Sequence, residues 1–212
     1  MDTPKGPKTL LNIAAELRKR IFEFALYREK DCLASFKVPA ICQVSREVRH
    51  EALPIFFDAC GQWKVILDTQ ISISPYAIGE ELYLCASHLR TDSGRKAALL
   101  SYGNAARFKS VAFRFVQRRY TYERDEHPGQ WGRFRRRHAR VPRVLNQIWM
   151  RVTNGRIDTS MDLPGMHLPR QWMDTIKDAS DRTTRKIRSL NAGREFQGLE
   201  YAELAQVASA FR

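Results

Sequence analysis

The dipeptide Asn154-Gly155 constrains the fold more than any other feature, because it lies between two runs of alternating apolar and polar residues. A type I′ hairpin turn needs positive φ at both central residues, and Asn followed by Gly is the pair that adopts it most readily. Two earlier runs, WKVILDTQISIS and KSVAFRFVQRR, are also typical of strands. In the second, Val111, Phe113 and Phe115 fall on one side, which predicts a half-buried strand. These runs predict a small antiparallel sheet.

Helical periodicity dominates the first 60 residues. A helix is expected at about 14–28, where Leu17, Ile21, Phe24 and Ala25 form one apolar stripe at i, i+4, i+7 and i+8. A second helical segment starts near Pro39, and Pro54 is expected to kink or split it after Leu53. Helices this short bury too little surface to be stable alone, so they must pack on the following residues.

Helices are also expected over 79–89, 93–108, 170–190 and 199–211, from their periodicity and their polar outer faces. Together these patterns predict an α+β fold, with N-terminal helices packed on a small antiparallel sheet with C-terminal helices. We divide the chain into a disordered tail (1–9), a helical module (10–60) and a basic α+β region (61–212).

The formal net charge of +13 is unevenly distributed, because residues 107–150 hold twelve Lys and Arg against three Asp and Glu. The run RFRRRHAR lies in this segment, close to Tyr120, Tyr122, Trp131 and Phe134. Cations neutralise phosphates and aromatic rings stack on bases, so the segment is a candidate polyanion-binding site. Two alternatives for the same run are a nuclear import signal and a solvated loop between strands. The candidate residues are Arg118, Arg119, Arg133, Arg135, Arg136, Arg137, Arg140 and Arg143.

Catalytic motifs are absent from the sequence: it contains no GxSxG, HExxH, P-loop or GxGxxG pattern, and its five histidines show no pairing. The four cysteines form no CxxC pair. We therefore expect a non-catalytic protein without metal or cofactor. MDTPKGPKTL lacks the apolar run of a secretory signal, and no apolar stretch is long enough to span a membrane, so we expect an intracellular protein of the cytoplasm and/or nucleus.

The two N-terminal segments, in this order, resemble the F-box-like module that is abundant in filamentous-fungal proteins. Ala14 stands where that family usually has Pro, and Ser45 where it usually has Cys. The resemblance covers about a quarter of the chain. Its first half, in NIAAELRKRIFEFAL, is carried by Ile13, Glu16, Leu17, Arg18, Arg20, Ile21, Phe22, Glu23 and Leu26. Its second half, in AICQVSREVRHEALPIFF, is carried by Ile41, Val44, Arg46, Val48, Arg49, Glu51, Ala52, Leu53, Pro54, Phe56 and Phe57.

The resemblance implies an adaptor role, in which the module docks on the Skp adaptor of a cullin-RING ubiquitin ligase and the rest of the chain captures a substrate protein. Ile13, Leu17, Ile21 and Leu26 are then expected to divide between this partner and the chain's own core, as in helix-in-groove recognition. The alternative is a stripe buried wholly inside the protein. The rival function is a basic nucleic-acid-binding protein that uses residues 107–150.

Overall fold

Five helices, three 3-10 turns and eight strands make up the computed structural model, which describes residues 10–73, 82–117, 120–124, 134–138, 143–162, 170–190 and 196–211. The helices are α1 (Ala15–Leu26), α2 (Arg46–Ala59), α3 (Ser93–Tyr102), α4 (Arg170–Ser189) and α5 (Tyr201–Ala210), and the 3-10 turns are η1 (Leu10–Asn12), η2 (Ala40–Gln43) and η3 (Gly103–Ala105). The strands are β1 (Asp31–Cys32), β2 (Trp63–Ile73), β3 (Leu82–Leu89), β4 (Ser110–Gln117), β5 (Tyr120–Arg124), β6 (Phe134–His138), β7 (Arg143–Thr153) and β8 (Arg156–Asp162).

Six of these strands form one sheet in the order β1-β2-β4-β7-β8, with β3 also paired to β2. β2 runs parallel to both β1 and β4, whereas β3, β7 and β8 are antiparallel to their neighbours. The expectation of an antiparallel sheet was therefore wrong: the sheet is mixed. After β3, the chain continues through α3 before it enters β4 on the other side of β2, and this crossover makes β2 and β4 parallel.

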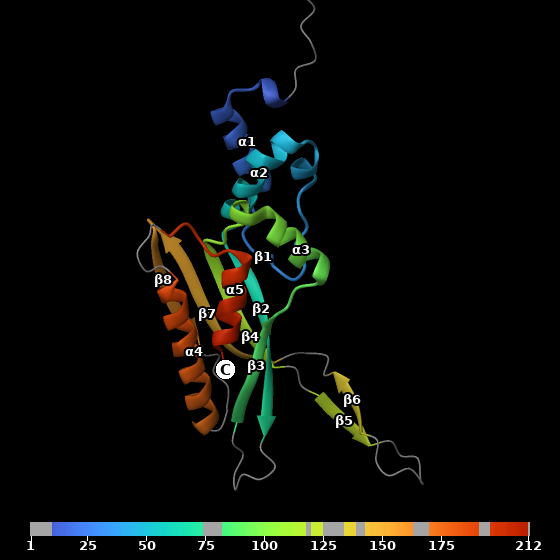
Figure 1. Cartoon of the computed structure of the whole chain (residues 1–212), viewed down its shortest axis with the longest axis vertical. Coiled ribbons are helices and arrows are strands. Elements are labelled where there is room, and N and C mark those ends of the chain that lie inside the picture. The colour runs from blue at the N-terminus through green and yellow to red at the C-terminus, as the bar shows by residue number, and fades with distance from the viewer. Residues whose placement is uncertain are drawn as a thin grey trace, which may run out of the picture.

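Helices α4 and α5 cover one face of the sheet, as Figure 1 shows. On that face the ring of Phe115 stacks on Phe211, with the ring centroids 3.7 Å apart, and Asn146 of β7 donates a hydrogen bond to Ser180 of α4. The expectation of a half-buried β4 was wrong, because Ala112 and Val116, on its other side, are also buried. β4 is a central strand, paired with β2 on one edge and with β7 on the other.

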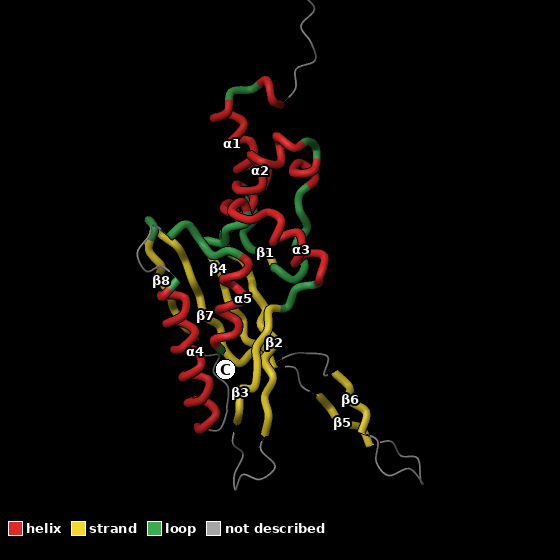
Figure 2. The backbone as a smooth tube through the Cα atoms, viewed as in Figure 1, coloured by secondary structure: helices red, strands yellow, loops and turns green. Residues whose placement is uncertain are grey.

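The N-terminal helices share a hydrophobic core with the sheet. Helices α1, α2 and α3 gather at one end of the strands, whereas α4 and α5 lie alongside them (Figure 2). Between the two groups, Trp63 at the start of β2 stacks on Phe57 of α2, and its indole Nε1–H donates a 3.0 Å hydrogen bond to the Phe57 carbonyl. One hydrophobic cluster extends from Phe22 to Phe211, so α1 and α2 are anchored through this aromatic contact.

Most of the predicted helices and strands are confirmed. The hairpin between β7 and β8 turns at Asn154 (φ 51°) and Gly155 (φ 71°), as the dipeptide predicted. The prediction of a helix over 79–89 was wrong, because residues 82–89 form β3. Pairing with β2 supplies the backbone hydrogen bonds of this segment and overrides its Leu and Ala residues, which favour a helix.

Pro54 does not split α2, which runs without a break from Arg46 to Ala59. The missing N–H of Pro54 would have paired with the carbonyl of His50 in the preceding turn. Both residues are exposed, so water can solvate this free carbonyl and the helix continues. The remaining side of α2 is held by buried Val48, Ala52, Phe56 and Phe57.

Candidate docking surface

Helix α1 carries two apolar stripes that face in different directions. Phe22 and Leu26, one turn apart, are 0% and 2% exposed and belong to the core. Leu17, Ile21 and Phe24 are 56%, 40% and 91% exposed. The spacing of these three, i, i+4 and i+7, places them on one side of the helix, away from the buried pair. We call Leu17, Ile21 and Phe24 the outer stripe.

An ion pair between Arg18 and Glu51 fixes α1 against α2. Arg18 lies one turn before Phe22 on the inward side of α1, and its Nε and Nη2 donate to the two carboxylate oxygens of Glu51 at 2.9 and 2.7 Å. Such bidentate pairing sets the orientation of both side chains. The hydrogen bonds from Arg18 lower the pKa of the Glu51 carboxyl below its usual value, and those to Glu51 raise the pKa of the Arg18 guanidinium.

Arg18 also holds the residues that precede α1. Its Nη1 donates to the carbonyl of Ile13 at 2.5 Å and to that of Leu11 at 3.1 Å. The N-cap residue Ala14 has no side-chain oxygen to cap the helix, so these bonds order the backbone before it instead. The side chain of Leu11 remains 43% exposed beside the start of the helix.

The four residues expected at the adaptor interface occupy different environments. Leu17 and Ile21 lie on the outer stripe, and Ile13 is half-buried. Leu26 is buried in the core, so of the four residues expected to divide between partner and core it lies on the core side. Phe24 is the most exposed of the three outer-stripe side chains but was not in the predicted set; its position at i+7 from Leu17 was the signal that identified it.

The candidate polyanion residues are only partly described. Arg118, Arg119, Arg133 and Arg140 lie outside the described residues. Arg135, Arg136 and Arg137 belong to β6, which pairs with β5 in a separate two-stranded sheet, and Arg143 opens β7. In this two-stranded sheet, which we call the β5–β6 ribbon, Tyr122 is paired with Arg136 and Arg124 with Phe134. Aromatic and cationic residues therefore occupy opposing register positions on the ribbon.

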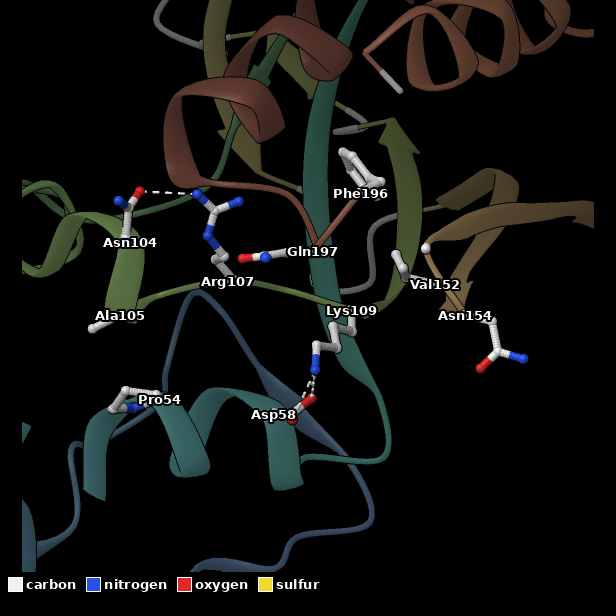
Figure 3. Close-up of a pocket in the computed structure, with 11 residues that line it drawn as sticks. Pro54, Asp58, Asn104, Ala105, Arg107, Lys109, Val152, Asn154, Phe196 and Gln197 are labelled. Carbon is white, nitrogen blue, oxygen red and sulfur yellow. Dashed lines mark hydrogen bonds and ion pairs between the residues drawn. The ribbon is translucent and has the colours of Figure 1, made fainter. Parts of the chain in front are cut away.

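A cavity of about 490 Å³ lies between α2, the loop after α3 and the β7–β8 turn (Figure 3). Two cationic side chains in its wall already have anionic partners. Arg107 donates to Glu200 at 2.8 Å and to Asn104 at 2.9 Å, and Lys109 lies 2.8 Å from Asp58. Because both charges are neutralised, this cavity offers little attraction to an anionic ligand.

Two of the described cysteines, Cys42 and Cys60, are buried, and burial raises the pKa of both thiols. A thiol that stays protonated is a weak nucleophile, which argues against a catalytic role for these two cysteines. Within the described residues, no group of three or more His, Cys, Asp and Glu side chains could hold a metal ion. None of the described helices is both long enough and apolar enough to cross a membrane.

No family model matches this chain, and neither the curated proteins nor the solved structures contain a significant match. The comparisons therefore assign no family to α1 and α2.

Proposed function

We propose that this chain is a non-catalytic interaction protein that docks, through the outer stripe of α1, on a Skp-type adaptor and serves as a substrate receptor of a cullin-RING ubiquitin ligase. The observation that carries the proposal is the position of Leu17, Ile21 and Phe24. They project away from the core while Phe22 and Leu26 hold the helix from the opposite side. An internal stripe, the alternative raised by the sequence, does not account for these exposures.

The chemistry of the outer stripe suits a groove on a partner protein. Three apolar side chains at i, i+4 and i+7 are the anchors by which an amphipathic helix binds a hydrophobic groove. Full burial of a Leu, Ile or Phe side chain contributes about 1.5–3 kcal/mol. The helix is also held in place before binding, because the Arg18–Glu51 pair fixes it on α2. A helix that is already ordered loses less conformational entropy on association.

The Skp-type adaptor is chosen as the partner because of the resemblance of residues 13–26 and 41–57 to the fungal F-box-like pattern. Leu17 and Ile21 are part of that pattern and also of the exposed stripe. The remaining sheet and C-terminal helices would then present a surface for the captured protein. This division between adaptor and substrate surfaces is the organisation that the resemblance implies.

A pull-down with the full chain and a purified Skp-type adaptor tests the proposal. Leu17→Asp combined with Ile21→Asp should abolish recovery of the adaptor while the circular dichroism spectrum and Tm stay close to wild type. Leu100→Asp is the matched control, because Leu100 is also an exposed apolar residue (53%) but lies on α3. If the double variant unfolds, or if the wild-type chain recovers no adaptor, the proposal fails.

Nucleic-acid binding by the β5–β6 ribbon is the second candidate function. It is favoured by the register, which pairs Tyr122 with Arg136 and Phe134 with Arg124. The affinity for a single-stranded nucleic acid should fall steeply as the salt concentration rises, because each phosphate contact releases counterions. A gel-shift titration at low salt should detect binding that is lost when Arg135, Arg136 and Arg137 are changed to Ser. No shift at low salt excludes this function.

A further inference from the structure

A second open groove, of about 740 Å³, lies between the η2–α2 segment and α3. None of its lining residues belongs to α1, so it is separate from the outer stripe. Three cationic side chains from three parts of the chain meet there: Lys37 before η2, Arg49 on α2 and Arg95 on α3. No Asp or Glu is among its lining residues in the described part of the chain.

The two arginines of this groove are oriented by backbone carbonyls. Arg49 Nε donates to the carbonyl of Cys42 at 3.0 Å, and Arg95 Nε donates to that of Phe36 at 3.1 Å. Asp92, at the rim, pairs with Arg95. Neither Lys37 nor Arg49 makes an ion pair with an acidic side chain of the described residues. The groove thus keeps an excess of positive charge, unlike the cavity around Arg107 and Lys109, where both cations are neutralised.

The two aromatic residues that line the groove, Phe36 and Tyr102, each pack against another ring. Phe36 is buried in the aromatic cluster against Trp63, and the half-buried Tyr102 packs against Phe57. Val38 and Ala98 complete the apolar lining. Binding of single-stranded nucleic acid relies on exposed rings on which bases stack. A groove that combines cations with Val38 and Ala98, and whose rings already pack against neighbouring rings, fits better to a peptide that carries both acidic and apolar side chains.

We propose that this groove binds an acidic peptide segment, whose carboxylates pair with Lys37 and Arg49 and whose apolar side chains contact Val38 and Ala98. The identification of that segment as part of a captured substrate rests on the proposed function; the binding itself does not. The groove and the outer stripe share no residue, so substitutions can test the two sites separately.

Fluorescence anisotropy with the full chain tests this proposal. The probes are a labelled peptide of about twelve residues built from Glu-Asp-Leu repeats and a matched Gln-Asn-Leu peptide. The acidic peptide should bind, more weakly as salt rises, and the neutral one should not. Lys37→Glu should weaken binding about fivefold or more, because it replaces an attraction with a repulsion. Arg49→Glu, as a second variant, should do the same.

Lys96→Glu is the matched control: it makes the same charge change on an exposed residue of α3 outside the groove lining, and it should alter the affinity less than about twofold. Leu17→Asp with Ile21→Asp should retain the acidic peptide, and Lys37→Glu should retain the adaptor, so the two proposals fail independently. Three outcomes would overturn the assignment. The neutral peptide could bind as tightly as the acidic one, or Lys37→Glu and Lys96→Glu could have equal effects. Binding could also be lost only when Arg135, Arg136 and Arg137 become Ser. Binding of a single-stranded oligonucleotide that depends on Lys37, without binding of the peptide, would overturn it as well.

Discussion

Arg18 and Glu51 join α1 to α2 through two parallel hydrogen bonds of 2.9 and 2.7 Å. This pair stands between residues that are 33 positions apart, and it lies on the same side of α1 as the buried Phe22 and Leu26. It therefore adds to the burial of Phe22 and Leu26, which turns this side of α1 inward. Leu17, Ile21 and Phe24 lie on the opposite side and face outward.

The first prediction concerns the pH dependence of this ion pair. The hydrogen bonds from Arg18 lower the pKa of Glu51 in the folded chain, so the stabilisation is present above the pKa of the unfolded chain and is lost as pH falls through the lowered folded value. Glu51→Gln should lower the Tm at neutral pH, and the difference from wild type should shrink as pH falls from about 5 to about 3. Thermal unfolding followed by circular dichroism measures both.

Glu23→Gln is the control for this experiment, because Glu23 is exposed and its ion pair with Lys19, at 3.8 Å, is longer and weaker. Its effect on the Tm should be small at every pH. A pH-independent loss of stability in Glu51→Gln would mean that the Glu51 side chain acts through packing and not through its charge.

The second prediction separates the two stripes of α1 by a matched pair of substitutions. Leu26→Ala removes a fully buried side chain and should reduce the free energy of unfolding by about 2–5 kcal/mol. Leu17→Ala, the same change on the outer stripe, should alter it by less than about 0.5 kcal/mol. Urea unfolding gives both values. Similar losses from the two substitutions would show that Leu17 is also a core residue.

The third prediction concerns Gly198, whose φ of +116° is a conformation that residues with a side chain rarely adopt. A Cβ there would approach the backbone of Phe108 to 3.1 Å, next to the paired hydrogen bonds between Phe108 and Leu199. Gly198→Ala should cost about 1–3 kcal/mol in the free energy of unfolding.

Gly94→Ala should change the free energy of unfolding in the opposite direction in the same assay. Gly94 lies in the first turn of α3, where a Cβ would meet only the Asp92 carboxylate at an ordinary contact distance of 3.4 Å. Ala is the better helix former, so this change should stabilise the chain by up to about 1 kcal/mol. If Gly198→Ala does not lower the free energy of unfolding, the strained conformation of Gly198 is not what makes glycine necessary there.

The sequence predicted the elements better than their arrangement. Asn154-Gly155 identified its hairpin because the turn is a local property of two residues. The helix expected over 79–89 is wrong for residues 82–89, because their strand conformation depends on pairing with β2, which no local pattern reveals. The parallel pairing of β2 with β4 could not be predicted from the strand patterns, because it depends on the path of the chain through α3.

The candidate sites were predictable to different degrees. The stripe of Leu17, Ile21 and Phe24 follows from helical spacing, but its direction does not, because Phe22 and Leu26 form a competing stripe on the same helix. The cationic groove gave no sequence signal at all. Lys37 and Arg95 are far apart in the chain and meet only because α3 packs beside the η2–α2 segment.

The most direct test of the account is a calorimetric titration of the full chain with a purified Skp-type adaptor. It is repeated with Leu17→Ala, Ile21→Ala, Phe24→Ala and the control Leu100→Ala. The account predicts that the wild-type chain and the control bind alike. Each outer-stripe variant should bind about tenfold more weakly, a loss of about 1.4 kcal/mol, with an unchanged Tm. Absence of binding by the wild-type chain, or equal affinity of all four variants, would contradict it.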